Sequence, residues 1–559
     1  MNAQPNATCD LALPPRLNPV LAEVLALRGI NDPKLATFAY KPLPPTGMLG
    51  LDAAARTLAD AIQAHAAITI VCDYDCDGAT ACTIGMRGLG ALGADVGYVV
   101  PNRRVHGYGL TPPVADLVHQ RRPFTKVLVT VDNGIAAHAG VARAKELGMT
   151  VVVTDHHLPG DTLPEADVIV DPNQHGCPFG SKAIAGCGVM YYVLAATRNE
   201  LALRGADVSP CDLPALLDIL ALGTVADVVP LDATNRWFVW HGLRHVQRGT
   251  AHAGINALFD VARRSCATAS SHDFGFSIGP RLNAAGRMDD MTVGIRCLLT
   301  DDTAEARTLA ASLDATNRQR RTVEDANLEE ALAQTDAAGS FSRVAYSPSF
   351  HEGVVGLVAA RLRERDHVPA VAFAPALQEG MLKGSARSIP SLHIRDALDL
   401  VNKRGHDFIP AFGGHSAAAG LSLRLVDLDR FKALFDAVCG ELLHGKVPDA
   451  ELHVDGMLAP EDINVDTARA LHGMPWGRDF EEPVWKGRFR VLDQCRVGPD
   501  AKHLKLTLDV AGKPFKAMRF FAPDGDPEPG TEIDLNYTLG YEVFREKEQV
   551  TLIDANRRV

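Results

Sequence analysis

The sequence predicts an α/β protein in three parts, and three patterns indicate this. Short apolar runs alternate with helical segments over residues 49–302, which is typical of a doubly wound parallel sheet. A stretch without proline or glycine, 303–335, predicts a long connecting helix to a second α/β segment at 336–447. Strictly alternating runs within 448–559 predict a small antiparallel β-barrel.

The overall composition fits a multidomain enzyme. At 559 residues the chain is too long for one core, and 47% hydrophobic with 22% charged residues is ordinary for a globular protein. The net charge of −12 excludes a histone-like coat but leaves room for a local basic groove. Eleven cysteines without a CxxC pair favour neither a disulfide framework nor a structural zinc site.

Residues 1–48 form a separate leading segment. Val20, Leu21, Val24, Leu25 and Leu27 predict a short helix, and a proline-rich connector follows it. Residues 1–14 show no basic region followed by an apolar run, and no stretch reaches the roughly 20 apolar residues that span a bilayer. We therefore expect a cytoplasmic protein without a membrane partner.

The first α/β segment contains a series of predicted strands. They lie at Ala67–Cys72, Val96–Val100, Lys126–Val131, Thr150–Thr154 and Ala166–Val170, and a Gly/Ala-rich helix runs through Ala79 to Leu92. In the C-terminal segment, His503–Val510 and Glu532–Leu539 alternate apolar and polar residues, with turns at Gly512 and Pro523–Pro527 between them.

Acidic residues follow three of these predicted strands directly. Asp73, Asp75 and Asp77 come after the first, Asp132 follows Val131, and Asp155-His156-His157 follows Thr154. In an open parallel sheet the carboxyl ends of the strands share one edge, where ligands bind. Carboxylates with a histidine suit Mg²⁺ or Mn²⁺ better than Zn²⁺. One Asp-Gly turn would usually be only a turn, but three such strand ends in consecutive units predict a metal site.

The ordered motifs resemble those of the DHH phosphoesterases, and in particular the RecJ family. The residues concerned are Asp73–Gly78, Asp132–Gly134, Asp155–His157 and Gly223–Pro230, with Gly279–Met288 and Asn102–Leu110 resembling segments of the RecJ branch. Two positions depart from the family pattern, because Cys72 stands for a glycine and His106 for an acidic residue. The resemblance covers about 70 to 540 and implies a DHH domain, a DHHA1 domain at 336–447 and an OB-like domain at 448–559.

The resemblance also assigns roles at the metal edge. It implies that two ions, Mn²⁺ or Mg²⁺, are held by Asp75, Asp77, Asp132, His156 and Asp227, with Asp132 as the bridge. Asp73 is either a ligand or an acceptor next to one, and Asp155 orients a histidine through its ring N–H. His157 is expected to contact the scissile phosphate. Two ions can activate a water molecule for in-line displacement, so the cysteines need no catalytic role.

A second group of residues is expected to hold the substrate. Ser385, Arg387 and His415 offer donors, and glycines such as Gly413 and Gly414 expose backbone N–H groups, which together suit a terminal phosphate. Arg281, Asn283 and Tyr108 are expected to line the same cleft. In the OB-like segment, basic and aromatic residues are interleaved in a manner that suits single strands, namely Lys502, Lys505, Phe515, Lys516, Arg519, Phe520 and Phe521.

The resulting hypothesis is a 5′→3′ exonuclease that hydrolyses single-stranded DNA to mononucleotides in DNA repair and recombination. The resemblance implies a single-strand-binding protein and a helicase as partners. One alternative is a phosphodiesterase for short oligonucleotides or cyclic dinucleotides, which the OB-like segment disfavours. Another is a non-catalytic replication scaffold, which the intact acidic set disfavours.

Overall fold

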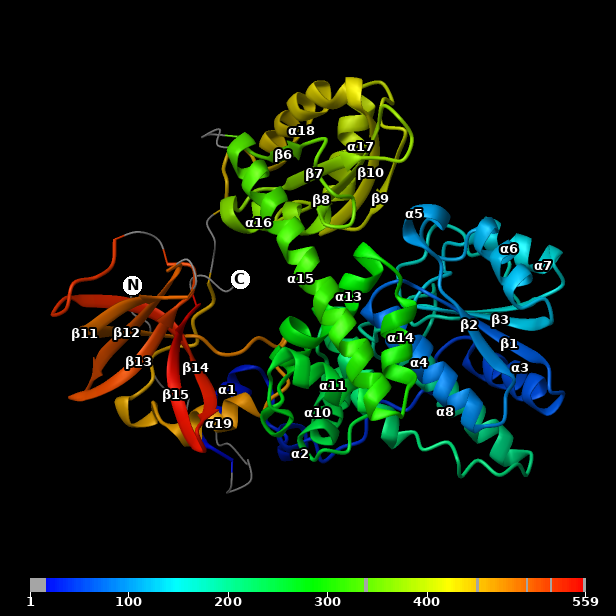
Figure 1. The fold of residues 1–559 in the computed structure, drawn as a ribbon, viewed down its shortest axis with the longest axis horizontal. Helices are drawn as coiled ribbons and strands as arrows, with labels where there is room; N and C mark the ends of the chain where they lie inside the picture. Colours follow the sequence, from blue (N-terminus) through cyan, green and yellow to red (C-terminus); the bar gives the residue numbers. More distant parts are fainter. Residues whose placement is uncertain (1–16, 336–339, 449–451, 499–500, 523–524, 556–559) are drawn as a thin grey trace. The chain divides into compact units, whose positions relative to one another are not determined.

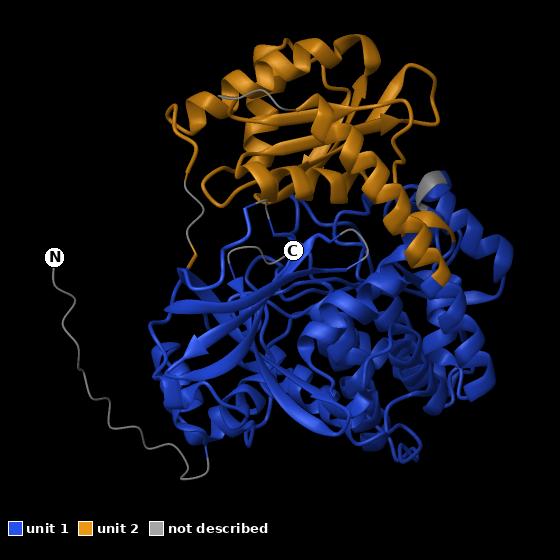
Figure 2. Ribbon diagram, turned by 60° about the vertical axis from the view of Figure 1, so that its left-hand side comes forward, with its two compact units in different colours: residues 1–286, 290–314, 453–559 blue, residues 287–289, 315–452 orange. Residues whose placement is uncertain are grey.

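The computed structural model describes residues 17–335, 340–448, 452–498, 501–522 and 525–555. The predictions about residues 1–14 and about the start of the turn at 523–527 lie outside the described residues. The chain divides into two compact units, coloured separately in Figure 2. Unit 1 comprises residues 1–286, 290–314 and 453–559, and unit 2 comprises 287–289 and 315–452.

Unit 1 contains a parallel five-stranded sheet in the order β2-β1-β3-β4-β5. Its strands are β1 Ala67–Cys72, β2 Val96–Val99, β3 Thr125–Val131, β4 Thr150–Thr154 and β5 Val168–Val170. The predicted strands are thus confirmed, with ends that differ by up to two residues. β1, β3 and β4 are almost wholly buried, because helices cover both faces of the sheet.

Helices cover both faces of this sheet (Figure 1). The residues packed on the two faces belong to separate apolar cores. On one face pack α3 Leu51–Gln63, α4 Cys76–Ala91 and α8 Gly186–Leu203, and on the other α6 Pro112–Arg121 and α7 His138–Glu146. This arrangement confirms the doubly wound fold. The short α5 spans Arg103–His106.

Further helices extend the first core. They are α1 Pro19–Leu27, α2 Pro33–Thr37, α9 Leu217–Ala226, α10 Ala233–Gln247, α11 Ala253–Ala262, α12 Ser271–Asp273, α13 Gly279–Met288 and α14 Thr292–Leu299. A π-helical turn at Phe274–Ile278 leads into α13. The predicted long helix is α15, Thr303–Gln334, which begins in unit 1 and continues into unit 2 after Asp314. Among the described residues no helix is both long enough and apolar enough to cross a bilayer.

Unit 2 is built on a mixed sheet in the order β6-β7-β8-β10-β9. The strands are β6 Arg343–Tyr346, β7 Ala370–Pro375, β8 Met381–Arg387, β9 Ala411–Gly414 and β10 Ala418–Arg424. Only β6 and β7 pair in parallel, and the other neighbours are antiparallel. The helices α16 Val355–Asp366, α17 Ile394–Arg404 and α18 Leu428–Leu442 complete this unit.

The C-terminal part of unit 1 is a closed barrel in the order β11-β12-β13-β15-β14. Its strands are β11 Trp485–Val497, β12 His503–Val510, β13 Lys513–Arg519, β14 Glu532–Phe544 and β15 Lys547–Asp554, preceded by α19 Val465–His472. The pair β13 and β15 is parallel rather than antiparallel. A closed ring with an odd number of strands cannot alternate direction throughout, so one parallel pair is unavoidable.

Candidate metal centre

The register of the parallel sheet brings the three acidic strand ends together. Cys72 pairs with Val131, and Val131 pairs with Thr154, so β1, β3 and β4 end level with one another. The next residue on each strand is an aspartate: Asp73, Asp132 and Asp155. These side chains therefore meet at one edge of the sheet, as the sequence predicts.

Two aspartates of the loop after β1 accept hydrogen bonds from backbone N–H groups. Asp75 caps α4 by accepting the Gly78 N–H at 3.0 Å. Asp77 is 1% exposed and accepts the N–H groups of Gly186 at 2.6 Å and Cys187 at 2.9 Å, at the start of α8. Backbone donors thus fix the Asp77 carboxylate in place before any cation is present.

The His156 ring lies close to three of the other predicted ligands. Its Nε2 lies 3.1 Å from Asp132 Oδ1, 3.5 Å from Asp227 Oδ2 and 3.8 Å from Asp77 Oδ2. Asp227 follows the last residue of α9. Oxygens of Asp73, Asp75 and Asp132 form a second group within 4.8 Å of one another. Asp132 lies in this group and also contacts His156, and the family resemblance implies that it bridges two ions.

These residues, Asp73, Asp75, Asp77, Asp132, His156 and Asp227, are called the acid cluster below. Two buried atoms at its centre, Asp132 Oδ1 and His156 Nε2, have no hydrogen-bond partner. These two atoms lie 3.1 Å apart, but they do not form a hydrogen bond with each other. Buried polar atoms are rarely left unsatisfied, and a cation between an oxygen and an unprotonated ring nitrogen would satisfy both. The donor set therefore fits a hard or borderline divalent metal.

Crowding of negative charge shapes the acid–base behaviour of the cluster. Burial, and then the neighbouring Asp77 and Asp75 carboxylates, raise the pKa of Asp132 and of Asp227 well above the usual range. Burial lowers the pKa of His156, which favours the unprotonated ring that a metal requires. A bound cation would reverse the repulsion between the carboxylates.

Backbone strain at the strand end also marks this site. Asp132 has a φ of 62°, a left-handed conformation that is uncommon for a residue other than glycine. Opposite it stands Gly186, where an added Cβ would lie 2.6 Å from the Asp132 Cβ. The strained turn and the absent side chain together bring the Asp132 carboxylate next to the start of α8.

Asp155 does not join the acid cluster but holds His157. Its Oδ1 lies 2.7 Å from His157 Nδ1, and its Oδ2 accepts the Ile135 N–H at 2.9 Å. Burial alone would raise the pKa of Asp155, but the hydrogen bond and charge of His157 outweigh it and lower that pKa. Burial opposes the charge on His157, yet Asp155 raises the pKa of His157 to about 9. The Asp155 carboxylate therefore favours the protonated form of His157.

Tyr108, on the segment between α5 and α6, lies beside His157. Its hydroxyl is 3.4 Å from His157 Nε2, the two rings meet edge to face, and the side chain is 52% exposed. His106, which stands where the family has an acid, uses Nδ1 to accept the Asn102 N–H at 3.0 Å. Cys72 is fully buried, and Cys76 is 1% exposed.

The fourth strand end carries an acid that the sequence reasoning missed. Asp171 follows β5 directly, is fully buried, and its Oδ2 has no hydrogen-bond partner. Its Oδ1 accepts the Asn173 N–H, and the Asn173 side chain donates to the His156 carbonyl at 2.6 Å. Burial, and then Asp155, raise the pKa of Asp171 to about 8. The available signal was an aspartate directly after the predicted strand Ala166–Val170.

Asn283 and Arg281, both on α13, contact protein groups. Asn283 Oδ1 accepts the Cys76 N–H at 2.8 Å and so braces the loop that carries Asp73, Asp75 and Asp77. Arg281 is 9% exposed, and its Nη2 lies 2.9 Å from an Asp314 oxygen on α15. Their expected contacts with substrate stay predictions.

In unit 2 the predicted substrate residues lie on neighbouring strands. Ser385 on β8 pairs with Gly420 on β10, and Gly420 pairs in turn with Gly413 on β9. Arg387 Nη1 donates to Ser385 Oγ at 2.8 Å. An added Cβ at Gly413 or Gly420 would meet nothing within 4 Å, so this surface is open. We call Ser385, Arg387, Gly413 and Gly420 the donor strip.

The hairpin between β9 and β10 carries the other two predicted substrate residues. Gly414 has a φ of 148°, and an added Cβ would lie 2.4 Å from the Ala418 carbonyl oxygen, so only glycine fits there. His415 is exposed, and its N–H donates to Ala418 O at 2.9 Å. Gly420 was missed, because cross-strand register cannot be read from a single strand.

On the barrel, three exposed or half-exposed rings gather at the end of β13. His503 meets Phe520 and Phe521 edge to face, with centroids 5.3 Å and 4.9 Å away. Phe520 is 40% exposed and Phe521 46%. By contrast, Arg519 pairs with Asp554, and Phe515 packs against the core. The aromatic part of the predicted surface is therefore more accessible than its arginine.

The comparison with known protein families agrees with this architecture. Residues 67–224 match the DHH family N-terminal domain, and residues 341–441 match the DHHA1 domain. These matches place the chain in the class of DHH-domain proteins, and the acid cluster lies at the sheet edge of the matched N-terminal domain. Residues 454–554 match the RecJ OB domain. The chain belongs to the RecJ family.

Individual relatives support that assignment over nearly the whole chain. The single-stranded-DNA-specific exonuclease RecJ of Salmonella typhimurium is 42% identical over 558 residues, covering 97% of this chain and 96% of the relative. That of Escherichia coli is 41% identical over 563 residues, with the same coverage. A crystal structure of RecJ in complex with Mn²⁺ from Thermus thermophilus matches with a TM-score of 0.80 at 28% identity, covering 97% of this chain and 76% of that one.

Proposed function

We propose that this chain is a metal-dependent exonuclease that degrades single-stranded DNA from the 5′ end to mononucleotides, in DNA repair and recombination. The observation that carries the proposal is the convergence of five carboxylates and His156. Two atoms of this cluster, Asp132 Oδ1 and His156 Nε2, are buried without a hydrogen-bond partner. Relatives over 40% identical are named single-stranded-DNA-specific exonucleases.

The metal ligands in this proposal are Asp75, Asp77, Asp132, His156 and Asp227, with Asp132 shared between two ions and Asp73 beside them. A RecJ structure from Thermus thermophilus contains Mn²⁺ and another contains Mg²⁺, and the oxygen-rich donor set here suits either ion. Two bound ions would supply an activated water molecule and stabilisation of the leaving oxygen.

The protein's own groups position the phosphate. Asp155 accepts the Nδ1 proton of His157, which leaves Nε2 to donate to a non-bridging oxygen of the scissile phosphate. Asp155 raises the pKa of His157, which favours a protonated donor, and a charged donor makes a stronger hydrogen bond. Tyr108 lies beside the same nitrogen, where its exposed ring can contact the terminal nucleotide.

The donor strip is the proposed site for the 5′-terminal phosphate. Ser385, Arg387 and His415 supply donors, and Gly413 and Gly414 let the phosphate approach the backbone. Arg281 and Asn283 remain proposed substrate residues, although the contacts of Asn283 support a bracing role as well. The exposed rings of the barrel provide stacking surfaces for bases farther along the strand.

Three further proposals concern the domain boundaries, the compartment and the protein partners. We place the domains at 1–48, 49–302, 303–335, 336–447 and 448–559, as the sequence patterns indicate. The cytoplasm is the proposed compartment. A single-strand-binding protein and a helicase are the proposed partners, and they rest on the family resemblance alone.

The test uses the full-length chain stripped with EDTA and a long single strand labelled at its 5′ end. We expect Mg²⁺ or Mn²⁺ to restore release of labelled mononucleotides, and duplex DNA to resist cleavage. Restoration by Zn²⁺ alone would contradict the metal assignment. Cleavage confined to oligomers of a few nucleotides would favour the short-oligonucleotide phosphodiesterase instead.

A further inference from the structure

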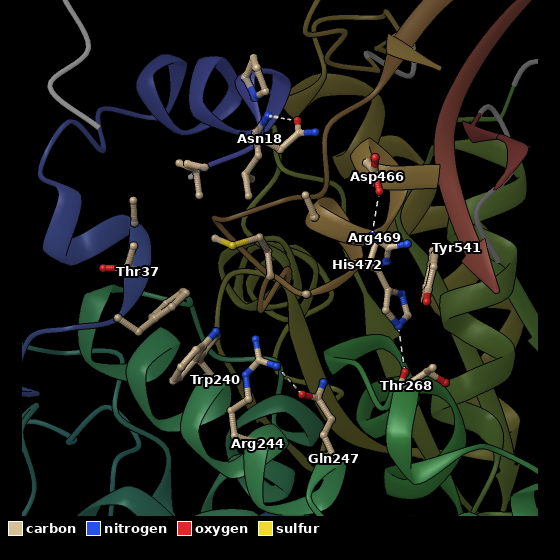
Figure 3. Close-up of a pocket in the computed structure, with 18 of the residues that line it drawn as sticks. Asn18, Thr37, Trp240, Arg244, Gln247, Thr268, Asp466, Arg469, His472 and Tyr541 are labelled. Carbon is tan, nitrogen blue, oxygen red and sulfur yellow. Dashed lines mark hydrogen bonds and ion pairs between the residues drawn. The ribbon is translucent and has the colours of Figure 1, made fainter. Parts of the chain in front are cut away.

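Unit 1 contains a cavity of about 920 Å³ whose lining includes no residue of the acid cluster (Figure 3). Its walls come from the segment Leu17–Phe38, from α10, and from α19 with Tyr541 of β14. A volume of this size is within the range of small-molecule sites. None of the roles proposed above uses this cavity.

One wall of the cavity is apolar. Leu21, Phe38 and Met474 line it and are almost wholly buried. The ring of Trp240 stacks on that of Phe38, with centroids 5.1 Å apart. This side of the cavity is therefore lined mainly by apolar groups.

Arg244 distinguishes this cavity from a simple apolar hollow. In Figure 3 its side chain projects from α10 between Trp240 and Gln247. The guanidinium lies 4.7 Å from the centre of the Trp240 ring, and Nη1 donates to Gln247 Oε1 at 2.8 Å. No carboxylate pairs with it among the residues that the structure describes. Most of its N–H donors are therefore available to a ligand.

A second arginine in the same cavity makes the contrast clear. Arg469 on α19 pairs with Asp466 and with Glu548, so its charge is neutralised within the protein. The half-buried Arg244 charge has no such compensation, and burial, followed by the nearby Arg248, lowers its pKa. An anion placed against Arg244 would replace the lost hydration and balance the charge.

We propose that this cavity binds a small organic anion, whose charged group pairs with Arg244 and whose apolar body lies along Phe38, Trp240 and Met474. The anionic group is a phosphate or a carboxylate, since both match the fork of a guanidinium. The site is independent of the proposed exonuclease function.

The probe for this site is 8-anilinonaphthalene-1-sulfonate, which combines one anionic group with an aromatic body. The full-length protein is expected to bind it saturably, with increased fluorescence. Arg244→Gln should weaken binding about tenfold or more, because a charged hydrogen bond is lost. The matched control is Arg248→Gln, one turn along the chain and exposed, which should change affinity less than about threefold. Equal loss in both variants would overturn the proposal.

A second variant tests the cavity with Arg244 intact. Ala470 lines the space, and Ala470→Phe would fill part of it, so probe binding should be lost while the melting temperature stays close to that of the parent. Unchanged probe affinity in Ala470→Phe would also overturn the proposal. Displacement of the probe by 5′-deoxyadenylate would select a phosphate-bearing ligand, and displacement by 4-phenylbutyrate a carboxylate-bearing one. Hydrolysis of DNA by Arg244→Gln should equal that of the parent.

Discussion

The acid cluster and the donor strip both lie on sheets, but they differ in burial and in charge. The acid cluster sits at the carboxyl edge of a parallel sheet, where Asp77 and Asp132 are almost wholly buried. The donor strip runs across antiparallel strands, and Gly413 and Gly420 leave it open. One region concentrates carboxylates at a cost in repulsion, and the other sets half-buried hydrogen-bond donors beside open glycine positions.

This difference separates two requirements of the proposed reaction. A metal needs ligands fixed to within a fraction of an ångström, which strand ends and backbone donors such as Gly186 N–H provide. A terminal phosphate needs hydrogen-bond donors that it can reach, and the open positions at Gly413 and Gly420 leave room beside Ser385 and Arg387. Four predictions test whether the two regions divide chemistry and recognition in this way.

The largest expected effect follows removal of the shared ligand. Asp132→Asn should lower hydrolysis more than about a hundredfold, since even the loss of a partner outside the ligand shell costs about 10–100-fold. The variant should remain folded in EDTA, because it relieves repulsion among buried carboxylates. Mn²⁺-dependent turnover and thermal melting measure the two effects. Near-parental turnover by the folded variant would exclude Asp132 from the chemistry.

The next effect concerns recognition. Arg387→Ala should reduce the preference for 5′-phosphorylated over 5′-hydroxyl strands about ten- to a hundredfold, because a charged hydrogen bond is lost. Lys383→Ala, on the same strand β8 and exposed, is the matched control. If Arg387→Ala weakens the binding of both substrates equally, Arg387 stabilises the sheet and does not recognise the phosphate. The proposed division of chemistry and recognition between the two regions would then be wrong.

The barrel extends the comparison to a third region. Deleting residues 448–559 is a poor test, because one apolar core runs from the parallel sheet through α10 to the barrel. Phe521→Ala instead removes one stacking surface, worth about 1–3 kcal/mol per base. Long strands should bind about tenfold more weakly with an unchanged salt dependence. Phe544→Ala, at a somewhat more exposed position on β14, should have no effect. Equal losses in both variants would exclude a binding role for the rings of His503, Phe520 and Phe521.

The smallest effect on activity is expected at Asp171. Its pKa of about 8, against an ordinary 3.8, means that the folded chain keeps a proton which the unfolded chain has released between these pH values. Stability should therefore fall as pH rises through this window. Asp171→Asn keeps the acceptor for Asn173 and should stabilise the apoprotein by on the order of 1–3 kcal/mol at pH 8, with little gain at pH 4. Denaturant unfolding at both pH values measures this change in stability. The control is Asp212→Asn, at an exposed position. A gain that is equal at both pH values would contradict the shift.

Most of the metal edge was predictable because the pattern is local. An acid directly after an apolar run needs only the parallel topology to reach the common edge, and this held for Asp73, Asp132 and Asp155. The family motifs added Asp227, which follows a helix. The barrel strand His503–Val510 was also predicted to its ends, because a two-residue period directly indicates a strand with one buried face.

Contacts between distant segments were decided by the tertiary structure. The brace from Asn283 to the Cys76 N–H joins residues 207 positions apart, and the row Ser385, Gly420 and Gly413 depends on cross-strand register. The cavity around Arg244 combines segments from both ends of the chain. Sequence periodicity determines which face of an element is buried, whereas partner and register depend on how all elements pack together.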